Sequence, residues 1–127
     1  MSVVVDTSIW VEYLRGNGYL ELEALLEEGG VVLAPVVAAE LMSPPLARHE
    51  RTDLRALLDS LPMHPAPLAH WCAVGELRQR LGRRGLTVST PDAHVAQCAL
   101  ETNGSLWSRD VIFRKVAAET KLRLFSP

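Results

Sequence analysis

The chain has 127 residues, of which 48% are hydrophobic and 22% are charged, and its formal net charge is −2 at pH 7. This length suits one domain, residues 1–127, with a buried core. No window approaches the roughly 18 apolar residues of a membrane-spanning helix, and Asp6 interrupts the first apolar run, so we expect no signal peptide. Cys72 and Cys98 do not form a CxxC pair, so we expect buried free thiols in a cytoplasmic protein.

The first half of the chain alternates short apolar strands with helices, the pattern of α/β proteins. Strands are expected at 2–5 and 31–34, where apolar residues follow one another without polar alternation, as in buried parallel strands. Ser8 stands where it can cap the first helix, and the three prolines between 62 and 67 leave room for only a short edge strand near Met63. The helices expected in this half cover 9–15, 19–28, a segment from Pro35 that carries Glu40 and Leu41, and 48–61.

The second half continues the alternation and ends on a strand. A long amphipathic helix is expected at 68–84, a helix opened by Pro91 at 91–101, a strand at 106–108, a short helix at 111–118 and a last strand at 122–125. The chain therefore predicts a three-layer α/β/α domain, with helices on both faces of a four- to five-stranded parallel sheet.

Four carboxylates stand in similar settings, near the ends of apolar segments where a helix begins: Asp6, Glu40, Asp92 and Asp110. The carboxyl ends of strands are where ligands bind in an open parallel sheet. Four carboxylates gathered there repel one another, and a hard divalent cation removes that repulsion. The pattern therefore predicts an Mg²⁺ or Mn²⁺ site, whose usual substrate is a phosphate ester.

Each carboxylate has a simpler explanation when it is taken alone. Asp6 can cap a helix, and Asp92 and Asp110 suit the first turns of helices. Glu40 can belong to a solvated helix face. A metal site is therefore indicated only by the occurrence of all four acids together.

Four segments resemble the PIN-domain ribonucleases of the VapC toxin type. Residues 3–16 are similar to the family's opening strand, aspartate, small hydroxyl pair and apolar helix. Residues 37–41 resemble its second acidic position, 90–96 its third and 106–113 its fourth, all in order and at the expected spacing. The resemblance covers nearly the whole chain and implies a PIN-like fold.

The resemblance also implies a mechanism and the residues that carry it out. Asp6, Asp92 and Asp110 would hold one or two metal ions directly, Glu40 would act partly through water, and Ser8 and Ser108 would brace the site by hydrogen bonds. Water activated by the metal would cut RNA to leave a 5′-phosphate and a 3′-hydroxyl. The RNA target stays open.

A basic cluster and an apolar stripe are the expected binding surfaces. The cluster, Arg78, Arg80, Arg83 and Arg84, is a candidate for RNA-backbone contacts, or else a basic helix end that complements the helix dipole before Gly85.

The apolar stripe consists of Trp10, Tyr13 and Leu14, which share one helix face and serve either the core or a groove for another protein. The resemblance implies that a VapB-type antitoxin occupies such a groove and neutralises the toxin, as in type II toxin–antitoxin systems. It also implies that the toxin forms homodimers and toxin–antitoxin hetero-oligomers.

His94 departs from the family pattern, which usually has an aliphatic residue there. It shares a helix face with Cys98, but two ligands do not make a zinc site, so we expect a packing role. The four histidines are scattered along the sequence and predict no catalytic dyad. Three other classes stay open: a DNA-directed metal nuclease, a catalytically silent binding module, and a phosphate-accepting signalling domain, which would need a lysine before Lys115.

Overall fold

The computed structural model describes all 127 residues and contains one four-stranded parallel sheet in the order β2-β1-β3-β4. This confirms the predicted parallel sheet, with the smaller of the two expected strand numbers. A single parallel bridge between Leu33 and Met63 is all that forms of the expected edge strand. The strands are β1 (Val3–Val5), β2 (Val31–Val32), β3 (Ser105–Trp107) and β4 (Arg123–Leu124).

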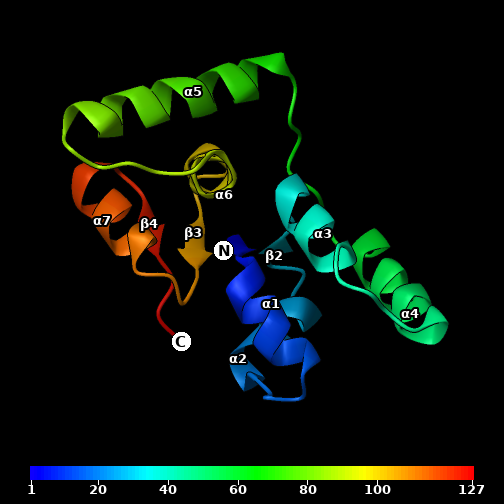
Figure 1. Cartoon of the computed structure of the whole chain (residues 1–127). Helices are drawn as coiled ribbons and strands as arrows, with labels where there is room; N and C mark the ends of the chain where they lie inside the picture. The colour runs from blue at the N-terminus through cyan, green and yellow to red at the C-terminus, as the bar shows by residue number, and fades with distance from the viewer.

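Seven helices surround the sheet (Figure 1). In Figure 1, α5 and α6 lie above the sheet, α1 and α2 lie below it, α7 lies beside β4, and α4 stands away from the rest. The helices are α1 (Thr7–Leu14), α2 (Leu20–Glu27), α3 (Pro35–Met42), α4 (Arg48–Asp59), α5 (Leu68–Arg83), α6 (Thr90–Glu101) and α7 (Ile112–Glu119). None of them combines the length and the apolar character that crossing a bilayer requires.

Helix α6 forms the centre of the packing. It contacts both middle strands, β1 and β3, as well as α3, α5 and α7. All three residues of β1 are completely buried, as is Leu106 of β3, so these strands carry apolar side chains on both faces. Helices that cover both faces of the sheet account for the unbroken run of valines in β1. Asp92 and Glu101, near the two ends of α6, are therefore fixed relative to the sheet.

The structure corrects one expectation about α1 and decides between two others. The helix begins at Thr7 and its N-cap position is Asp6, so Ser8 lies inside the first turn and does not cap the helix. Trp10 is completely buried in the core, Tyr13 is half-buried and only Leu14, at 47%, is well exposed. Trp10 therefore serves the core, which was one of the two expected roles, and Leu14 stays available at the surface.

The two cysteines differ in their surroundings. Cys98 is buried in α6, as expected, whereas Cys72 on α5 is exposed. Helix α5 is amphipathic, and its buried residues are His70, Val74, Leu77 and Leu81, which places Cys72 on the other side of the helix.

Candidate metal centre

The strand order creates a crevice between β1 and β3. After β1 the chain moves through α1 and α2 to β2 on one side, and after β3 it moves through α7 to β4 on the other side. Ligands in open α/β sheets bind where connections leave in opposite directions in this way, at the carboxyl ends of the strands. Asp6 directly follows β1, and Ser108 directly follows β3. The backbone N–H of Asp6 donates to the carbonyl of Trp107 (2.9 Å), so the two strand ends are joined at this point.

Asp6 is the buried acid of this crevice. Its residue is only 4% exposed, and its backbone occupies the N-cap position of α1, yet its side chain makes no capping hydrogen bond. Instead, Oδ2 of Asp6 accepts hydrogen bonds from the hydroxyls of Ser108 (2.7 Å) and Ser8 (3.0 Å). The helix-cap explanation of Asp6 therefore fails at the level of the side chain. A carboxylate is kept in a buried position only where such partners or a cation compensate it.

The two serines also hold the loops after β1 and β3 together. Their Oγ atoms lie 3.3 Å apart. The Ser8 hydroxyl accepts from the backbone N–H of Arg109 (3.1 Å), and the Ser108 hydroxyl accepts from the backbone N–H of Asp110 (3.0 Å). Each serine thus connects the buried carboxylate to the backbone of the loop that carries Asp110.

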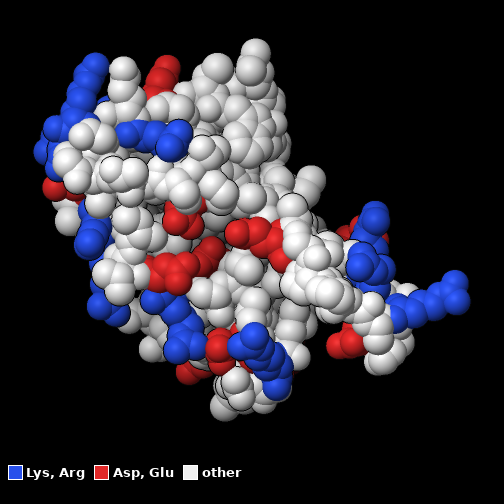
Figure 2. Space-filling view, viewed as in Figure 1, with Lys and Arg blue, Asp and Glu red and all other residues white.

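The neighbours of Asp110 show that the four acids lie near one another. Burial raises the pKa of its carboxyl, and the nearby Asp6, Asp92 and Glu40 raise it further. Three separate segments supply these neighbours: the end of β1, α3 and the first turn of α6. Figure 2 shows acidic side chains gathered in the middle of one face, between α3, α6 and the end of β3.

Glu40 and Asp92 reach the pocket from helices. The Thr7 hydroxyl donates to Oε1 of Glu40 (2.7 Å), which links α1 to α3. Asp92 lies in the first turn of α6, where Ser89 caps the helix by accepting from the Asp92 backbone N–H (3.2 Å). The role of Thr7 was missed from the sequence, although the Thr7-Ser8 pair directly after Asp6 was the available signal. Glu40 and Asp110 are exposed and Asp92 is half-buried, so the pocket opens to solvent.

The donor atoms of this pocket fit a hard divalent cation. All four side chains offer carboxylate oxygens, the ligands that hard divalent cations prefer. Burial raises the pKa of Asp110 most, and the like charges of Asp6, Asp92 and Glu40 add to that rise. A divalent ion would reverse this effect, because its charge favours the ionised carboxylate.

A salt bridge borders the pocket next to Asp110. The Arg109 guanidinium lies 3.2 Å from Oε1 of Glu12, which also receives Arg15 at 3.9 Å. Glu12 therefore keeps the Arg109 side chain beside α1. This pair was missed from the sequence, since Glu12 and Arg109 lie at opposite ends of the chain.

The predicted basic cluster lies at the carboxyl-terminal end of α5. Arg78 donates to the carbonyl of Val88 (2.8 Å), and Arg84 pairs with Glu119 (3.0 Å), so these two have partners within the protein. Arg80 and Arg83 lie in the last turn of α5 and, with Arg84 and Glu119, line a surface pocket of about 440 Å³. The structure thus has the features of a basic helix end and also leaves two arginines directed to solvent.

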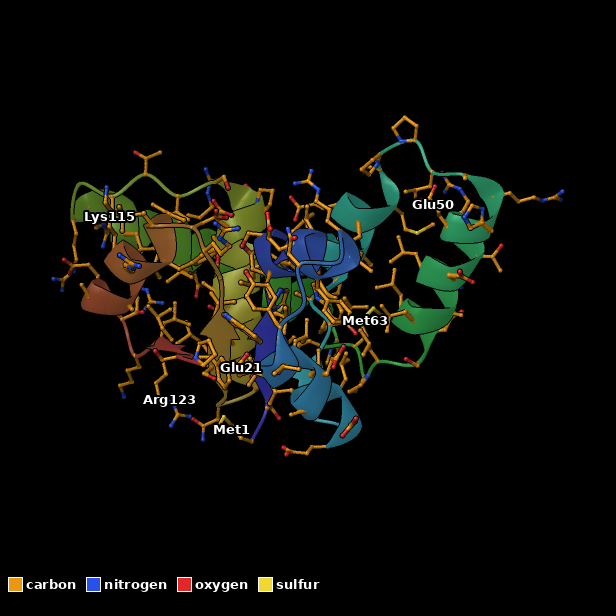
Figure 3. All side chains as sticks on the ribbon, turned by 90° about the horizontal axis from the view of Figure 1, so that it is seen from below. Met1, Glu21, Glu50, Met63, Lys115 and Arg123 are labelled. Carbon is orange, nitrogen blue, oxygen red and sulfur yellow. The ribbon has the colours of Figure 1, made fainter.

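An apolar groove lies between α1 and α4. It has a volume of about 330 Å³, and its lining residues are Leu14, Leu46, Glu50, Asp53, Leu54 and Leu57. Figure 3 shows α4, on which Glu50 is labelled, standing apart from the body of the protein, with Met63 between them. Of the three stripe residues, Leu14 therefore lines the groove, whereas Trp10 and Tyr13 do not.

The histidines are not scattered, which corrects the expectation from the sequence. His70 contacts both His64 and His94, with ring centroids 5.6 Å and 4.7 Å apart, and only His49 lies elsewhere, on α4. His94 is completely buried and stacks on Trp71 with ring centroids 4.5 Å apart. This matches the packing role expected for His94, and its Nε2 is 3.8 Å from Sγ of Cys98 on the same helix face.

Comparison with known proteins identifies the family. A sequence model of the PIN domain matches residues 3–119, and the chain belongs to the PIN-domain family. It is 29% identical over 131 residues to VapC ribonuclease Mb1587 of Mycobacterium bovis and to ribonuclease VapC11 of Mycobacterium tuberculosis, with 98% of each chain covered. Nucleases of this family use a divalent metal ion, in agreement with the donor set of the pocket.

Solved structures show the same fold. A structure of VapBC2 from Rickettsia felis, bound to a DNA fragment from its promoter, superposes with a TM-score of 0.80 at 20% identity, and 98% of both chains is covered. VapBC-1 from nontypeable Haemophilus influenzae gives a TM-score of 0.73 at 17% identity, with coverage of 99% of this chain and 98% of that one. These likenesses confirm the predicted PIN-like α/β fold.

Proposed function

We propose that this chain is the toxin of a type II toxin–antitoxin system, a VapC-type endoribonuclease that depends on Mg²⁺ or Mn²⁺. One observation carries the proposal. The buried Asp6 carboxylate accepts hydrogen bonds from two serines at the crevice between β1 and β3, and three further acids lie near it. Curated relatives that align over almost their whole length are named ribonucleases, which favours RNA over DNA as the substrate.

The chain's residues would divide the work at a scissile phosphodiester. Asp6, Asp92 and Asp110 would hold the metal directly, Ser8 and Ser108 would keep Asp6 oriented, and Glu40, held by Thr7, would orient a water molecule at the pocket. The ion, when bound, would supply charge stabilisation for the phosphoryl oxygens and lower the pKa of a water molecule. No histidine or lysine base is required.

The RNA backbone would be held by the arginines at the end of α5. Arg80 and Arg83 have no acidic partner among the ion pairs of the structure, whereas Arg84 is paired with Glu119. Guanidinium groups bind phosphate oxygens in a fork. Arg78 and Arg84 would contribute less than the other two, because contacts within the protein already hold them.

An antitoxin would occupy the groove between α1 and α4. Its apolar lining suits one face of a helix, and the carboxylates of Glu50 and Asp53 at the same groove suit basic residues of that helix. Related folds are seen in VapBC and FitAB complexes, which favours a partner of the VapB type. In this proposal the toxin also pairs with a second copy of itself, so that two toxins share one antitoxin assembly.

The first prediction concerns Asp6. We expect Asp6→Asn to lower Mn²⁺-dependent RNA cleavage by at least about 100-fold, the size of effect seen when one preorganised electrostatic group is removed. The melting temperature should stay equal or rise, because one repelling charge is removed. Cleavage assays and thermal melts measure both, and Asp59→Asn, a change of an exposed aspartate on α4, is the matched control. Near-wild-type cleavage by Asp6→Asn would contradict the assignment.

The second prediction concerns the end of α5. In an Asp6→Asn background that does not cut RNA, the double variant Arg80→Gln, Arg83→Gln should bind single-stranded RNA more weakly. The slope of log K against log salt should become shallower by about 0.7 for each RNA phosphate that the protein no longer neutralises. The matched control is Arg48→Gln with Arg51→Gln, two exposed arginines of α4. If both pairs leave affinity and salt slope unchanged, the basic cluster is only a helix end.

The third prediction separates the groove from the active site. Leu14→Glu places a charge in the apolar groove and should abolish neutralisation by the cognate antitoxin, while RNA cleavage by the isolated toxin persists. Leu20→Glu, at a leucine of α2 that is 79% exposed and outside the groove, should leave neutralisation intact. Pull-down and cleavage assays with the co-expressed antitoxin measure these effects. Full neutralisation of the Leu14→Glu variant would place the antitoxin elsewhere.

A further inference from the structure

A second group of metal-ligating side chains lies away from the four acids. Ligand atoms of His64, His70 and Cys98 all lie within 4.8 Å of one another. They come from three separate parts of the fold: the segment between α4 and α5, the first turn of α5, and the middle of α6. The side chain of His70 is 1% exposed and that of His64 is 10% exposed, so neither imidazole is simply a solvated surface group.

Glu101 completes this group with an oxygen. It lies three residues after Cys98 on α6, which places both on one helix face. Its Oε1 lies 2.7 Å from Nε2 of His64 and 2.8 Å from Nδ1 of His70, so two ring nitrogens converge on one carboxylate oxygen. Burial alone would raise the pKa of Glu101, but hydrogen bonds from His64, Gln97 and His70 lower it to about 2. The contacts of Oε1 with both imidazoles place this carboxylate oxygen within the group.

Cys98 is the least satisfied member of the group. It is completely buried, and its polar neighbour is Nε2 of His94 at 3.8 Å, a weak contact. Burial, followed by the charge of Glu101, raises the pKa of the thiol to about 12. The Cys98 sulfur lies within 4.8 Å of the ligand atoms of both His64 and His70, and a metal ion would bind it as a thiolate.

His94 is placed to orient the ring of His70. Its Nδ1 lies 2.7 Å from Nε2 of His70, and its Nε2 faces Cys98. In the structure, Nε2 of His94 accepts from the backbone N–H of Val36 (3.4 Å). With Nδ1 of His70 bound to a metal, Nε2–H of His70 would donate to Nδ1 of His94. Metal-binding histidines in proteins depend on partners of this kind for their ring orientation. Trp71, stacked on His94, keeps that ring in place.

We propose that His64, His70, Cys98 and Glu101 form a second metal site, which takes a divalent transition metal such as Zn²⁺. Two imidazoles, a thiolate and a carboxylate are a zinc-type donor set, whereas Mg²⁺ prefers oxygen alone. In a tetrahedral zinc site, neighbouring ligand atoms lie about 3.5 Å apart. On metal binding, the 2.7 Å and 2.8 Å contacts of Glu101 with the two imidazoles would therefore lengthen. The spacings among His64, His70 and Cys98, which reach up to 4.8 Å, would shorten by about 1 Å.

Metal at this site would link α6, the helix that carries Asp92, to two other segments. His64 is next to Met63, which forms a β-bridge with Leu33 at the sheet edge. His70 lies in the first turn of α5. Cys98 and Glu101 belong to the second half of α6, whose first turn carries Asp92. Binding to the folded chain alone raises its stability. This second site is independent of the proposed ribonuclease function, because it uses different residues and a different metal chemistry.

The test is a titration of the full-length Asp6→Asn chain with Co²⁺, monitored by absorption spectroscopy. Cobalt bound to a thiolate gives a near-ultraviolet charge-transfer band that an all-oxygen carboxylate centre does not give. We expect such a band to saturate at one equivalent, Zn²⁺ to abolish it, and Zn²⁺ to raise the melting temperature. His64→Ala should weaken Co²⁺ binding at least tenfold, and Cys98→Ser should remove the band.

The matched controls change a histidine and a cysteine that lie outside the proposed site. His49→Ala and Cys72→Ser change exposed residues and should leave the band and the affinity unchanged. Cys98 is buried, so its variant is checked by thermal melting, and His64→Ala decides the question if Cys98→Ser does not fold. Absence of a thiolate band, or unchanged Co²⁺ affinity in His64→Ala, would overturn the proposal and leave a closed hydrogen-bonded network between α5 and α6.

Discussion

The hydrogen bonds from Ser8 and Ser108 to the buried carboxylate of Asp6 are the constraint on which the rest of the site depends. They join the ends of β1 and β3, the two central strands, at the crevice where the chain turns to opposite sides of the sheet. The same two hydroxyls accept from the backbone of the loop that carries Asp110. The positions of Asp6 and Asp110 are therefore set together, and neither can move without breaking this network.

This arrangement brings four negatively charged side chains together. Burial raises the pKa of Asp110, and the charges of Asp6, Asp92 and Glu40 raise it further; a divalent cation would relieve this repulsion. The opposite half of α6 has a different chemistry, with nitrogen, sulfur and one carboxylate oxygen between α5 and α6. Helix α6 thus takes part in two polar clusters. The four carboxylates lie at its start, and the cluster with nitrogen and sulfur ligands lies towards its end. The packing of α6 on β1 and β3 keeps the two clusters apart.

Much of this could be predicted from the sequence, because local pattern fixes helices, buried strands and the acids directly after them. The bounds of α5 differ from the expected ones by one residue, and the run of valines correctly predicted β1. Contacts between distant segments could not be predicted this way. The bond from Thr7 to Glu40, the complete burial of Trp10 and the assembly of three histidines all depend on how helices pack, which apolar periodicity does not specify. The site residues themselves were identified by motif, and their catalytic roles stay predictions.

The most direct test of the central claim is a carboxyl-detected NMR titration of the metal-free protein, repeated with saturating Mg²⁺. If the four acids share one pocket that a divalent ion balances, the pKa of Asp110 lies above its ordinary value of 3.8 without metal and falls below that value when Mg²⁺ is added. In Asp6→Asn, the metal-free pKa of Asp110 should move back towards 3.8, because one neighbouring charge is gone. An ordinary Asp110 pKa that responds neither to Mg²⁺ nor to Asp6→Asn would contradict the account.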